Sequence, residues 1–268
     1  MLLTSLQNPR IKRVLKLKTS RGRRASHLTL IDGWREIRAA FRSGIDLPEV
    51  FVCPEGPPSA RVWSLAKQMA KRGSHVFEVT RKVYDKLAYG ERQDGLVAVA
   101  RPVRGHLDDL DFSRLGTCLV LENIEKPGNL GAVLRTCDAA GVDAVLMTGT
   151  KTDIYHPNVI RASLGTVFHI PVVSCDAERA CAQLKSHGVP IVAAVCQAET
   201  LYTDISFRAP VAIVLGSEEK GLSPFWLRHS DHQVRIPMRG SADSLNVSVS
   251  AALLVYEALK QHSDFSPS

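Results

Sequence analysis

Apolar residues in the first hundred positions form short runs that alternate with segments of helical spacing. Four of these runs predict strands, at 27–31, 50–53, 76–79 and 95–100. Apolar positions that recur every three or four residues predict helices at 8–19, 34–43, 61–72 and 82–88. Strands that alternate with helices are typical of an α/β domain, so the first part of the chain predicts a small one.

The same alternation returns after residue 113. Apolar runs predict strands at 118–121, 144–147, 172–173, 190–195, 211–215 and 234–236, and helical spacing predicts helices at about 130–140, 177–187 and 246–261. Continuous apolar strands are typical of a mostly parallel sheet that is covered on both faces. Residues 101–113 are rich in proline, glycine and charge and show no periodicity, which indicates a linker. We therefore expect a domain at 1–100, a linker at 101–113 and a second domain at 114–268.

The charge of the chain is divided unevenly between these parts. The 268 residues carry 34 basic and 27 acidic side chains, a net charge of +7. Residues 1–104 hold 21 basic and 9 acidic side chains, a net charge of +12, so the remainder carries −5. Such asymmetry favours nucleic acid or an anionic membrane surface over a solvated helix face, and the membrane is the weaker of the two because the basic stretch lacks a large apolar face. The candidate RNA-binding residues precede the first acidic residue, and they are Arg10, Lys12, Arg13, Arg21, Arg23 and Arg24.

Cysteine usage and hydropathy limit the compartment. No pair of the six cysteines has the spacing of a metal site, so we interpret them as reduced thiols and expect no metal. The chain shows no signal peptide and no apolar run of about 18 residues, so we expect no membrane span. The expected location is the cytoplasm.

Three loops, each just after a predicted strand, combine polar residues with glycine. The first holds Asn129 and runs into a helix that carries Arg135, the second is 215–222, and the third is 236–246. In open α/β sheets, ligands bind beyond the carboxyl ends of the strands. Asn129 is either a helix cap or a functional residue. Arg135 lies in an otherwise apolar helix, which predicts a buried partner or an anionic ligand.

The second and third loops differ from the common nucleotide-binding motifs. Gly216 and Gly221 have the spacing of a phosphate-binding loop, but Leu222 stands where that motif needs lysine. We interpret the two glycines as a tight turn that presents backbone groups to a ligand, with Glu218 either structural or functional. No GxGxxG sequence follows a strand, which disfavours a Rossmann dinucleotide site.

Taken in this order, the three loops resemble the signature motifs of the SpoU (TrmH) family of RNA ribose 2′-O-methyltransferases, within the SPOUT superfamily. The matching stretches are ENIEKPGNLGAVLRTCDAAGVDAV, IVLGSEEKGLS and IPMRGSADSLNVSVSAALLVYEAL, which cover most of residues 116–261. The first domain resembles the ribosomal-protein-L30e-like substrate-binding domain of ribosomal RNA members. It departs from that pattern at 32–36, where DGWRE stands in place of the commoner EG-x-x-E.

The resemblance implies a fold and a chemistry. The fold is a small L30e-like α/β domain followed by a SPOUT α/β domain with a C-terminal trefoil knot, in a homodimer. S-adenosylmethionine is the implied methyl donor, held against Thr148, Gly149, Leu215, Gly216, Ile236, Met238 and Leu245. Catalytic roles are implied for Asn129, Arg135, Glu218, Ser244 and Asn246. The implied reaction is methylation of a ribose 2′-hydroxyl in RNA, with 23S ribosomal RNA favoured over transfer RNA because of the L30e-like domain.

Two questions remain open at the level of sequence. Family proposals make Arg135 a general base, but removing a proton from a guanidinium near neutral pH costs roughly 7–9 kcal/mol. We prefer Arg135 as a cation that holds a phosphate and polarises the 2′-oxygen, while Ser244 and Asn246 orient the ribose. A non-catalytic RNA-binding relative and a cofactor-free small-molecule enzyme are the alternative classes.

Overall fold

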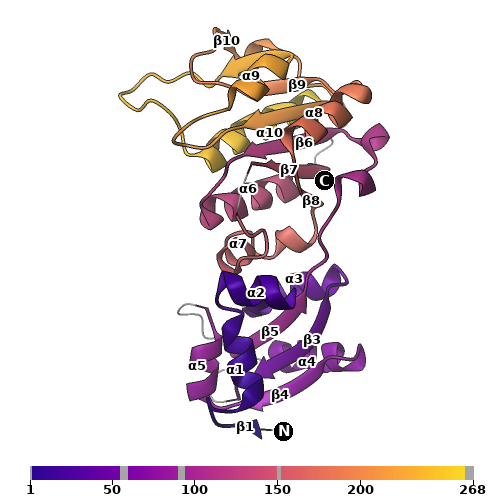
Figure 1. Ribbon diagram of the computed structural model, residues 1–268, viewed down its shortest axis with the longest axis vertical. Helices are drawn as coiled ribbons and strands as arrows, with labels where there is room; N and C mark the ends of the chain where they lie inside the picture. Colours follow the sequence, from indigo (N-terminus) through magenta and orange to yellow (C-terminus); the bar gives the residue numbers. More distant parts are fainter. Residues whose placement is uncertain (1, 55–59, 90–93, 150–151, 263–268) are drawn as a thin grey trace. The chain divides into compact units, whose positions relative to one another are not determined.

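The structure is a computed structural model that describes residues 2–54, 60–89, 94–149 and 152–262. The chain divides into two compact units (Figure 1). Unit 1 comprises residues 1–103 and 155–169, and unit 2 comprises 104–154 and 170–268. The segment 155–169 therefore packs with residues 1–103 although more than fifty residues separate them along the chain. No helix among the described residues is long and apolar enough to cross a membrane.

Unit 1 is a five-stranded mixed sheet with helices on both faces. Its elements are β1 (Leu2–Leu3), α1 (Pro9–Lys16), α2 (Ser20–Ser26), β2 (Thr29–Asp32), α3 (Trp34–Arg42), β3 (Asp46–Val52), α4 (Ala60–Lys71), β4 (His75–Val79), α5 (Arg81–Leu87), β5 (Leu96–Arg101), α7 (Pro157–Ala162) and the 3-10 turn η3 (Thr166–Phe168). The strand order over the described residues is β1-β4-β3-β5-β2, in which β5 runs antiparallel to both of its neighbours. The predicted strands and helices of this region are confirmed, apart from small shifts in their bounds.

Alternation of side chains along β3 and β5 explains why both faces of this sheet are covered. Phe51, Val97 and Val99 point to the face that α1 and α5 cover with Ile11, Val14 and Leu87. The intervening residues Val50, Val52 and Ala98 are equally buried, on the opposite face. Helices α3 and α4, which pack against β2, β3 and β5 and against one another, supply apolar side chains such as Ile37 and Met69.

The segment 155–169 completes unit 1. The Thr29 hydroxyl donates a hydrogen bond to the Tyr155 carbonyl at 2.7 Å, and the Arg161 guanidinium donates to the Tyr89 carbonyl at 2.9 Å. Gly165 has a φ of +86°, and a Cβ there would lie 2.7 Å from the Ala39 side chain. This close approach to α3 requires glycine. Sequence patterning does not predict α7, because six residues are too few to establish a helical period.

Unit 2 is a seven-stranded sheet in which every described strand pair is parallel. Its elements are η1 (Leu107–Asp109), η2 (Phe112–Arg114), β6 (Thr117–Glu122), α6 (Pro127–Ala140), β7 (Ala144–Thr148), β8 (Val172–Cys175), α8 (Ala177–Ser186), β9 (Ile191–Ala194), β10 (Thr200–Leu201), η4 (Tyr202–Asp204), β11 (Val211–Leu215), α9 (Pro224–His229), β12 (His232–Arg235) and α10 (Val247–Gln261). The order over the described residues is β10-β12-β9-β11-β6-β7-β8. The predicted α/β class with a mostly parallel sheet is confirmed.

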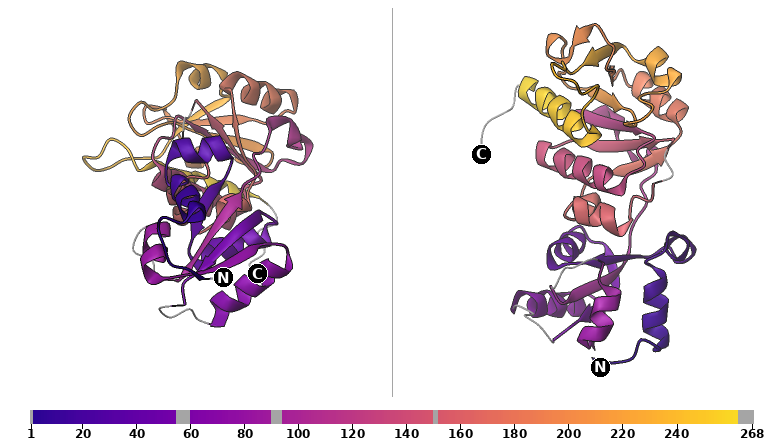
Figure 2. Two further views of the ribbon diagram at one scale, coloured as in Figure 1. Left: turned by 60° about the horizontal axis from the view of Figure 1, so that its bottom comes forward. Right: turned by 90° about the vertical axis from the view of Figure 1, so that its left-hand side faces the viewer.

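Helices cover both faces of the sheet in unit 2 (Figure 2). Helices α6 and α10 pack side by side, while α8 and α9 pack together and bury Leu184 and Trp226 against Val120 and Val214. Residues within the segment expected to be a linker take part in this second core, since Leu107 and Phe112 are buried in it. The turns η1 and η2 that hold them are too short to produce a periodic pattern in the sequence.

Candidate active site

A cavity of about 630 Å³ opens where β9, β11 and β12 end. Parallel neighbours end at the same edge of a sheet, so their following loops meet there. The lining comes from Ala194–Gln197 after β9, Leu215–Leu222 after β11, Ile236 and Met238 after β12, and residues 243–245 before α10. The third loop and the second loop of the sequence therefore share one site, as their positions after strands predict.

The loop after β11 folds into a tight turn. The Gly221 amide donates to the Ser217 carbonyl at 2.9 Å, and Gly221 has a φ of +64°. A Cβ on Gly216 would lie 2.2 Å from the Gly221 backbone, which leaves no room for a side chain. The two glycines thus serve the turn, and the chain at 216–221 presents its backbone to the cavity.

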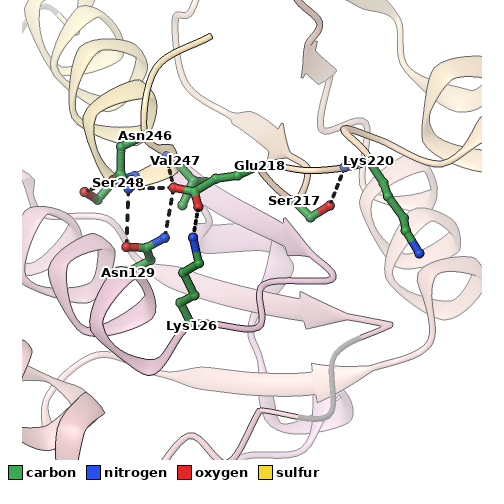
Figure 3. Close-up of polar contacts among 8 residues, drawn as sticks. All are labelled: Lys126, Asn129, Ser217, Glu218, Lys220, Asn246, Val247 and Ser248. Carbon is green, nitrogen blue, oxygen red and sulfur yellow. Dashed lines mark hydrogen bonds and ion pairs between the residues drawn. The ribbon is translucent and has the colours of Figure 1, made fainter.

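The Glu218 carboxylate is the centre of a polar network (Figure 3). Its Oε2 accepts a hydrogen bond from Lys126 Nζ at 2.8 Å. Its Oε1 accepts from Asn129 Nδ2 at 3.0 Å, from Asn246 Nδ2 at 2.5 Å and from the Val247 amide at 3.4 Å. Asn246 Nδ2 also lies 3.3 Å from Asn129 Oδ1. One side chain therefore links the loop after β11 to the first turns of α6 and α10.

The ion pair between Lys126 and Glu218 shifts the pKa values of both residues. The Lys126 ammonium, followed by the Val247 amide and the Asn129 amide, holds the pKa of Glu218 below its usual value. The hydrogen bond that Lys126 donates to Glu218 raises the pKa of Lys126 in return. Both side chains reach solvent, so we interpret the pair as a means of orientation rather than as a large source of stability.

Asn246 has two roles, which explains its place at the start of α10. Its Oδ1 caps the helix by accepting from the Ser248 amide at 3.0 Å and from the Ser248 hydroxyl at 2.6 Å. Its Nδ2 faces Glu218 and Asn129. A side-chain amide suits this position because it can accept at one end and donate at the other.

Asn129 is not a helix cap. Helix α6 begins at Pro127 with Lys126 in the N-cap position, because proline favours the first turn of a helix. Asn129 is thus the third residue of the helix, and its side chain turns to Glu218. The alternative that Asn129 merely caps α6 is wrong.

Arg135 and Ser244 lie outside this network. Arg135 is exposed on α6, on the side opposite the buried Val133, Leu134 and Cys137, so the expected buried partner is not found among the described residues and the alternative, an anionic ligand, stays a prediction. The Arg135 side chain forms no hydrogen bond or ion pair within the described residues. Ser244 is exposed and lies on the wall of the cavity.

The residues expected to hold a cofactor fall into two groups. Five line the cavity, namely Leu215, Gly216, Ile236, Met238 and Leu245. Thr148 and Gly149 are not among its lining residues, since β7 stands two positions from β11 in the sheet. There the Thr148 carbonyl accepts from the Asn123 amide at 2.9 Å, and a Cβ on Gly149 would lie 2.5 Å from Asn123 Oδ1.

Two parts of the site escaped the sequence analysis. The first is Ala194–Gln197, which overlaps and continues the end of the predicted strand 190–195 and could have been found by applying the strand-end rule to it. The second is Lys126, whose pairing with Glu218 spans 92 residues. No local pattern predicts such a long-range contact.

The basic residues near the N-terminus differ in their surroundings. Arg10 and Arg13 both pair with the buried carboxylate of Glu49, and Arg10 also lies over the Phe77 ring. Arg23 is buried and donates to the carbonyls of Leu17 and Lys18 at 3.0 and 3.2 Å, so it is a structural residue rather than an RNA ligand. The remaining candidates, Lys12, Arg21 and Arg24, are exposed.

Comparisons with known proteins cover nearly the whole chain. The model of the SpoU rRNA Methylase family matches residues 116–256, and that of the MRM3-like substrate binding domain matches residues 8–98. The 23S rRNA (guanosine(2553)-2′-O)-methyltransferase RlmP of Bacillus subtilis is 28% identical over 254 residues, which are 95% of this chain and 97% of the relative. An uncharacterized tRNA/rRNA methyltransferase of Synechocystis is 30% identical over 97% of this chain and 93% of its own.

Solved structures show the same similarity over both units. The crystal structure of an RNA 2′-O ribose methyltransferase is 42% identical and superposes with a TM-score of 0.86, covering 97% of this chain and 99% of the other. An AdoMet-bound rRNA methyltransferase from Sinorhizobium meliloti is 27% identical, with a TM-score of 0.88 and 97% coverage of both chains. The similarity therefore extends beyond the three loops.

Proposed function

The chain belongs to the SpoU rRNA methylase family, and we propose that it transfers a methyl group from S-adenosylmethionine to a ribose 2′-hydroxyl of ribosomal RNA, in the large subunit's 23S RNA. The observation that carries the proposal is the Glu218 network at the rim of a cavity that is lined by five of the seven residues expected to hold the donor. The Bacillus relative acts on 23S RNA, which favours that RNA over transfer RNA.

The cavity fits S-adenosylmethionine in size and lining. Its volume of about 630 Å³ lies within the range of roughly 300–1,000 Å³ typical of small-molecule sites. Leu215, Ile236, Met238 and Leu245 offer apolar contacts for a flat ring, and the turn at 216–221 offers backbone donors and acceptors. When bound, the donor supplies an electrophilic methyl group.

The network assigns distinct work to its side chains. Glu218 fixes the amide of Asn246 from one side, and the helix cap fixes it from the other, so that Asn246 is held rigidly at the cavity rim. Asn246 and Ser244 orient the ribose. Asn129 supports Asn246 and shares its acceptor.

Arg135 supplies positive charge. An exposed guanidinium without a protein partner among the described residues is free to bind a phosphate. We propose that it holds the target phosphate and stabilises the charge that develops on the 2′-oxygen, while a general base is not required of it.

A second copy of the chain completes the proposed enzyme. Val249, Leu253 and Tyr256 on α10 are 46%, 37% and 48% exposed and recur at the spacing of one helix face. We propose that this face forms the homodimer interface. Leu253→Glu places a charge in its centre, so we expect a monomer in analytical ultracentrifugation where the parent chain sediments as a dimer.

Incubation with labelled S-adenosylmethionine and unmodified 23S, 16S and transfer RNA tests the function. We expect label in 23S RNA alone, at a 2′-oxygen that primer extension then maps. Gly216→Val is the matched control, because its side chain would collide with the Gly221 backbone and deform the turn, so that donor binding is lost. Label in transfer RNA would show that transfer RNA, rather than 23S RNA, is the substrate. RNA binding with neither donor binding nor methyl transfer would indicate a non-catalytic relative. In either case we propose that the protein acts in the cytoplasm, where ribosomes work.

A further inference from the structure

Trp34 is held rigidly at the start of α3, in the DGWRE stretch where unit 1 departs from its family pattern. Its backbone amide donates to Asp94 Oδ2 at 3.1 Å, and its indole Nε1 donates to the Arg61 carbonyl on α4 at 3.3 Å. The side chain is only half-buried. One hydrogen bond thus anchors the backbone of Trp34 and another anchors its indole ring, which still reaches the surface.

Two guanidinium groups lie against this ring. The central carbon of Arg38 is 4.3 Å from the ring centre and that of Arg61 is 4.8 Å from it. Both distances are within the range of cation–π contacts. Because both guanidinium groups lie over the ring, a base can stack on the outer side of a guanidinium plane or on the part of the ring that the arginines leave uncovered.

Basic residues outnumber acidic ones on α3 and α4 around Trp34, while the nearby Asp94 carboxylate accepts from the Trp34 amide. Helices α3 and α4 pack together, and their one acidic residue, Glu36, is buried. Their basic residues are Arg35, Arg38, Arg42, Arg61, Lys67 and Lys71. Within the described part of the chain, none of these six residues forms an ion pair.

The basic run near the N-terminus is different. One carboxylate, that of Glu49, pairs with both Arg10 and Arg13 there, and the Arg23 guanidinium is buried against backbone carbonyls. Exposed cations of unit 1 therefore lie on α3 and α4 as well as at Lys12, Arg21 and Arg24. Apolar membrane anchors are absent from this surface, since none of the large exposed hydrophobic residues of the described chain lies on either helix.

We propose that the α3–α4 surface, defined by Trp34, Arg35, Arg38, Arg42 and Arg61, binds single-stranded RNA, with a base stacked on the Trp34–arginine platform. The inference rests on the proposed function, because it names where the RNA substrate is held. Stacking explains the aromatic ring and phosphate contacts explain the unpaired cations.

Fluorescence and affinity measurements on the full chain test the platform. The probe is a short labelled single-stranded RNA, compared with the same sequence as a duplex. Trp34→Ala is expected to weaken single-strand binding on the order of tenfold and duplex binding little. Trp34→Phe keeps a stacking surface, so its affinity stays within a few-fold of the parent chain, while the RNA-induced quenching of tryptophan fluorescence is lost.

The double variant R38Q/R61Q tests the cations separately. It is expected to flatten the dependence of log affinity on log salt by about 1.4, or about 0.7 for each phosphate contact. R179Q/K185Q removes the same charge from α8 of unit 2 and should leave RNA binding unchanged. Donor binding to the cavity is measured in every variant to establish that it is folded.

Several outcomes would overturn the platform. They are parent-like affinity of Trp34→Ala, equal losses for single strand and duplex, or an effect of R179Q/K185Q as large as that of R38Q/R61Q. Displacement of the RNA by poly-glutamate at equal charge would also overturn it, since it would assign the surface to an acidic protein. Absence of methyl transfer by the parent chain would count against the enzyme instead, because these binding readouts do not depend on transfer.

Discussion

The cavity rim of unit 2 and the α3–α4 surface of unit 1 are both polar, but they differ in how their charges are satisfied. At the rim, the Glu218 carboxylate accepts four hydrogen bonds from within the protein. On α3 and α4, cations cluster around Trp34 without carboxylate partners in the described chain. A network that is satisfied internally fixes geometry, whereas an unsatisfied surface retains its capacity to bind a partner. Substitutions at the rim should therefore change turnover, and substitutions on the surface should change RNA affinity.

Substitution of Arg135 is expected to have the largest effect on turnover. This residue is a cation of unit 2 whose side chain has no partner among the described residues. Arg135→Lys keeps the charge and loses the planar fork, so we expect kcat to fall roughly 100-fold. RNA affinity, measured by filter binding, should change less than twofold. Near-normal kcat would contradict both the phosphate-holding role and the general-base role of this residue.

Asn246 separates helix capping from the Glu218 contact. Asn246→Asp retains an oxygen for the Ser248 amide but places a second carboxylate beside Glu218, so we expect about tenfold lower kcat with little change in thermal stability. Asn246→Ala loses the cap as well, which costs about 1 kcal/mol in the free energy of unfolding.

Steady-state kinetics and thermal denaturation of the two Asn246 variants measure these effects. The comparison fails if Asn246→Asp turns over like the parent chain, because the contact with Glu218 would then be irrelevant to the reaction. If both variants lose activity and only Asn246→Ala loses stability, the contact with Glu218 serves the reaction and the helix cap serves stability.

Lys126 lowers the pH at which the Glu218 carboxylate becomes protonated and the ion pair is lost. Because Lys126 holds the pKa of Glu218 below its usual 4.5, the ion pair's contribution is present above about pH 4.5 and is lost as the pH falls through the lowered pKa. Lys126→Gln should raise the pKa of Glu218 and move the acid limb of the kcat profile to higher pH. A carboxyl NMR titration of Glu218 checks the shift. An unchanged titration would show that the Val247 backbone amide and the side-chain amide donors are sufficient to keep the pKa of Glu218 low.

Cys196 provides the mildest test, at the wall of the cavity. It is exposed and lines the cavity, whereas burial raises the pKa of Cys175 to about 11 and that of Cys137 to about 12. Iodoacetamide should therefore label Cys196 first, and S-adenosylmethionine should slow that labelling several-fold. Mass spectrometry identifies the labelled residue. If S-adenosylmethionine does not change the rate of Cys196 labelling, the donor binds outside this cavity.

Local patterns in the sequence predicted most of the elements and the ends of the strands that form the site. The apolar runs at 211–215 and 234–236 correspond to β11 and to the end of β12, and the cavity lies beyond them. Arg23 was misread because its charge suggests solvent, while the turn after α1 brings carbonyls to its guanidinium. Helix α2, which carries it, lacks the apolar period that reveals α1.

The sequence by itself determined the α/β class, the parallel sheet of unit 2 and the three loops, because side-chain periodicity and glycine placement act over a few neighbouring residues. Only the tertiary structure decided which of those residues meet. It brought Lys126, Asn129 and Asn246 to Glu218, removed Arg23 from the candidate RNA ligands, and packed 155–169 into unit 1. These contacts join residues far apart along the chain, and they depend on which strands become neighbours in the sheet.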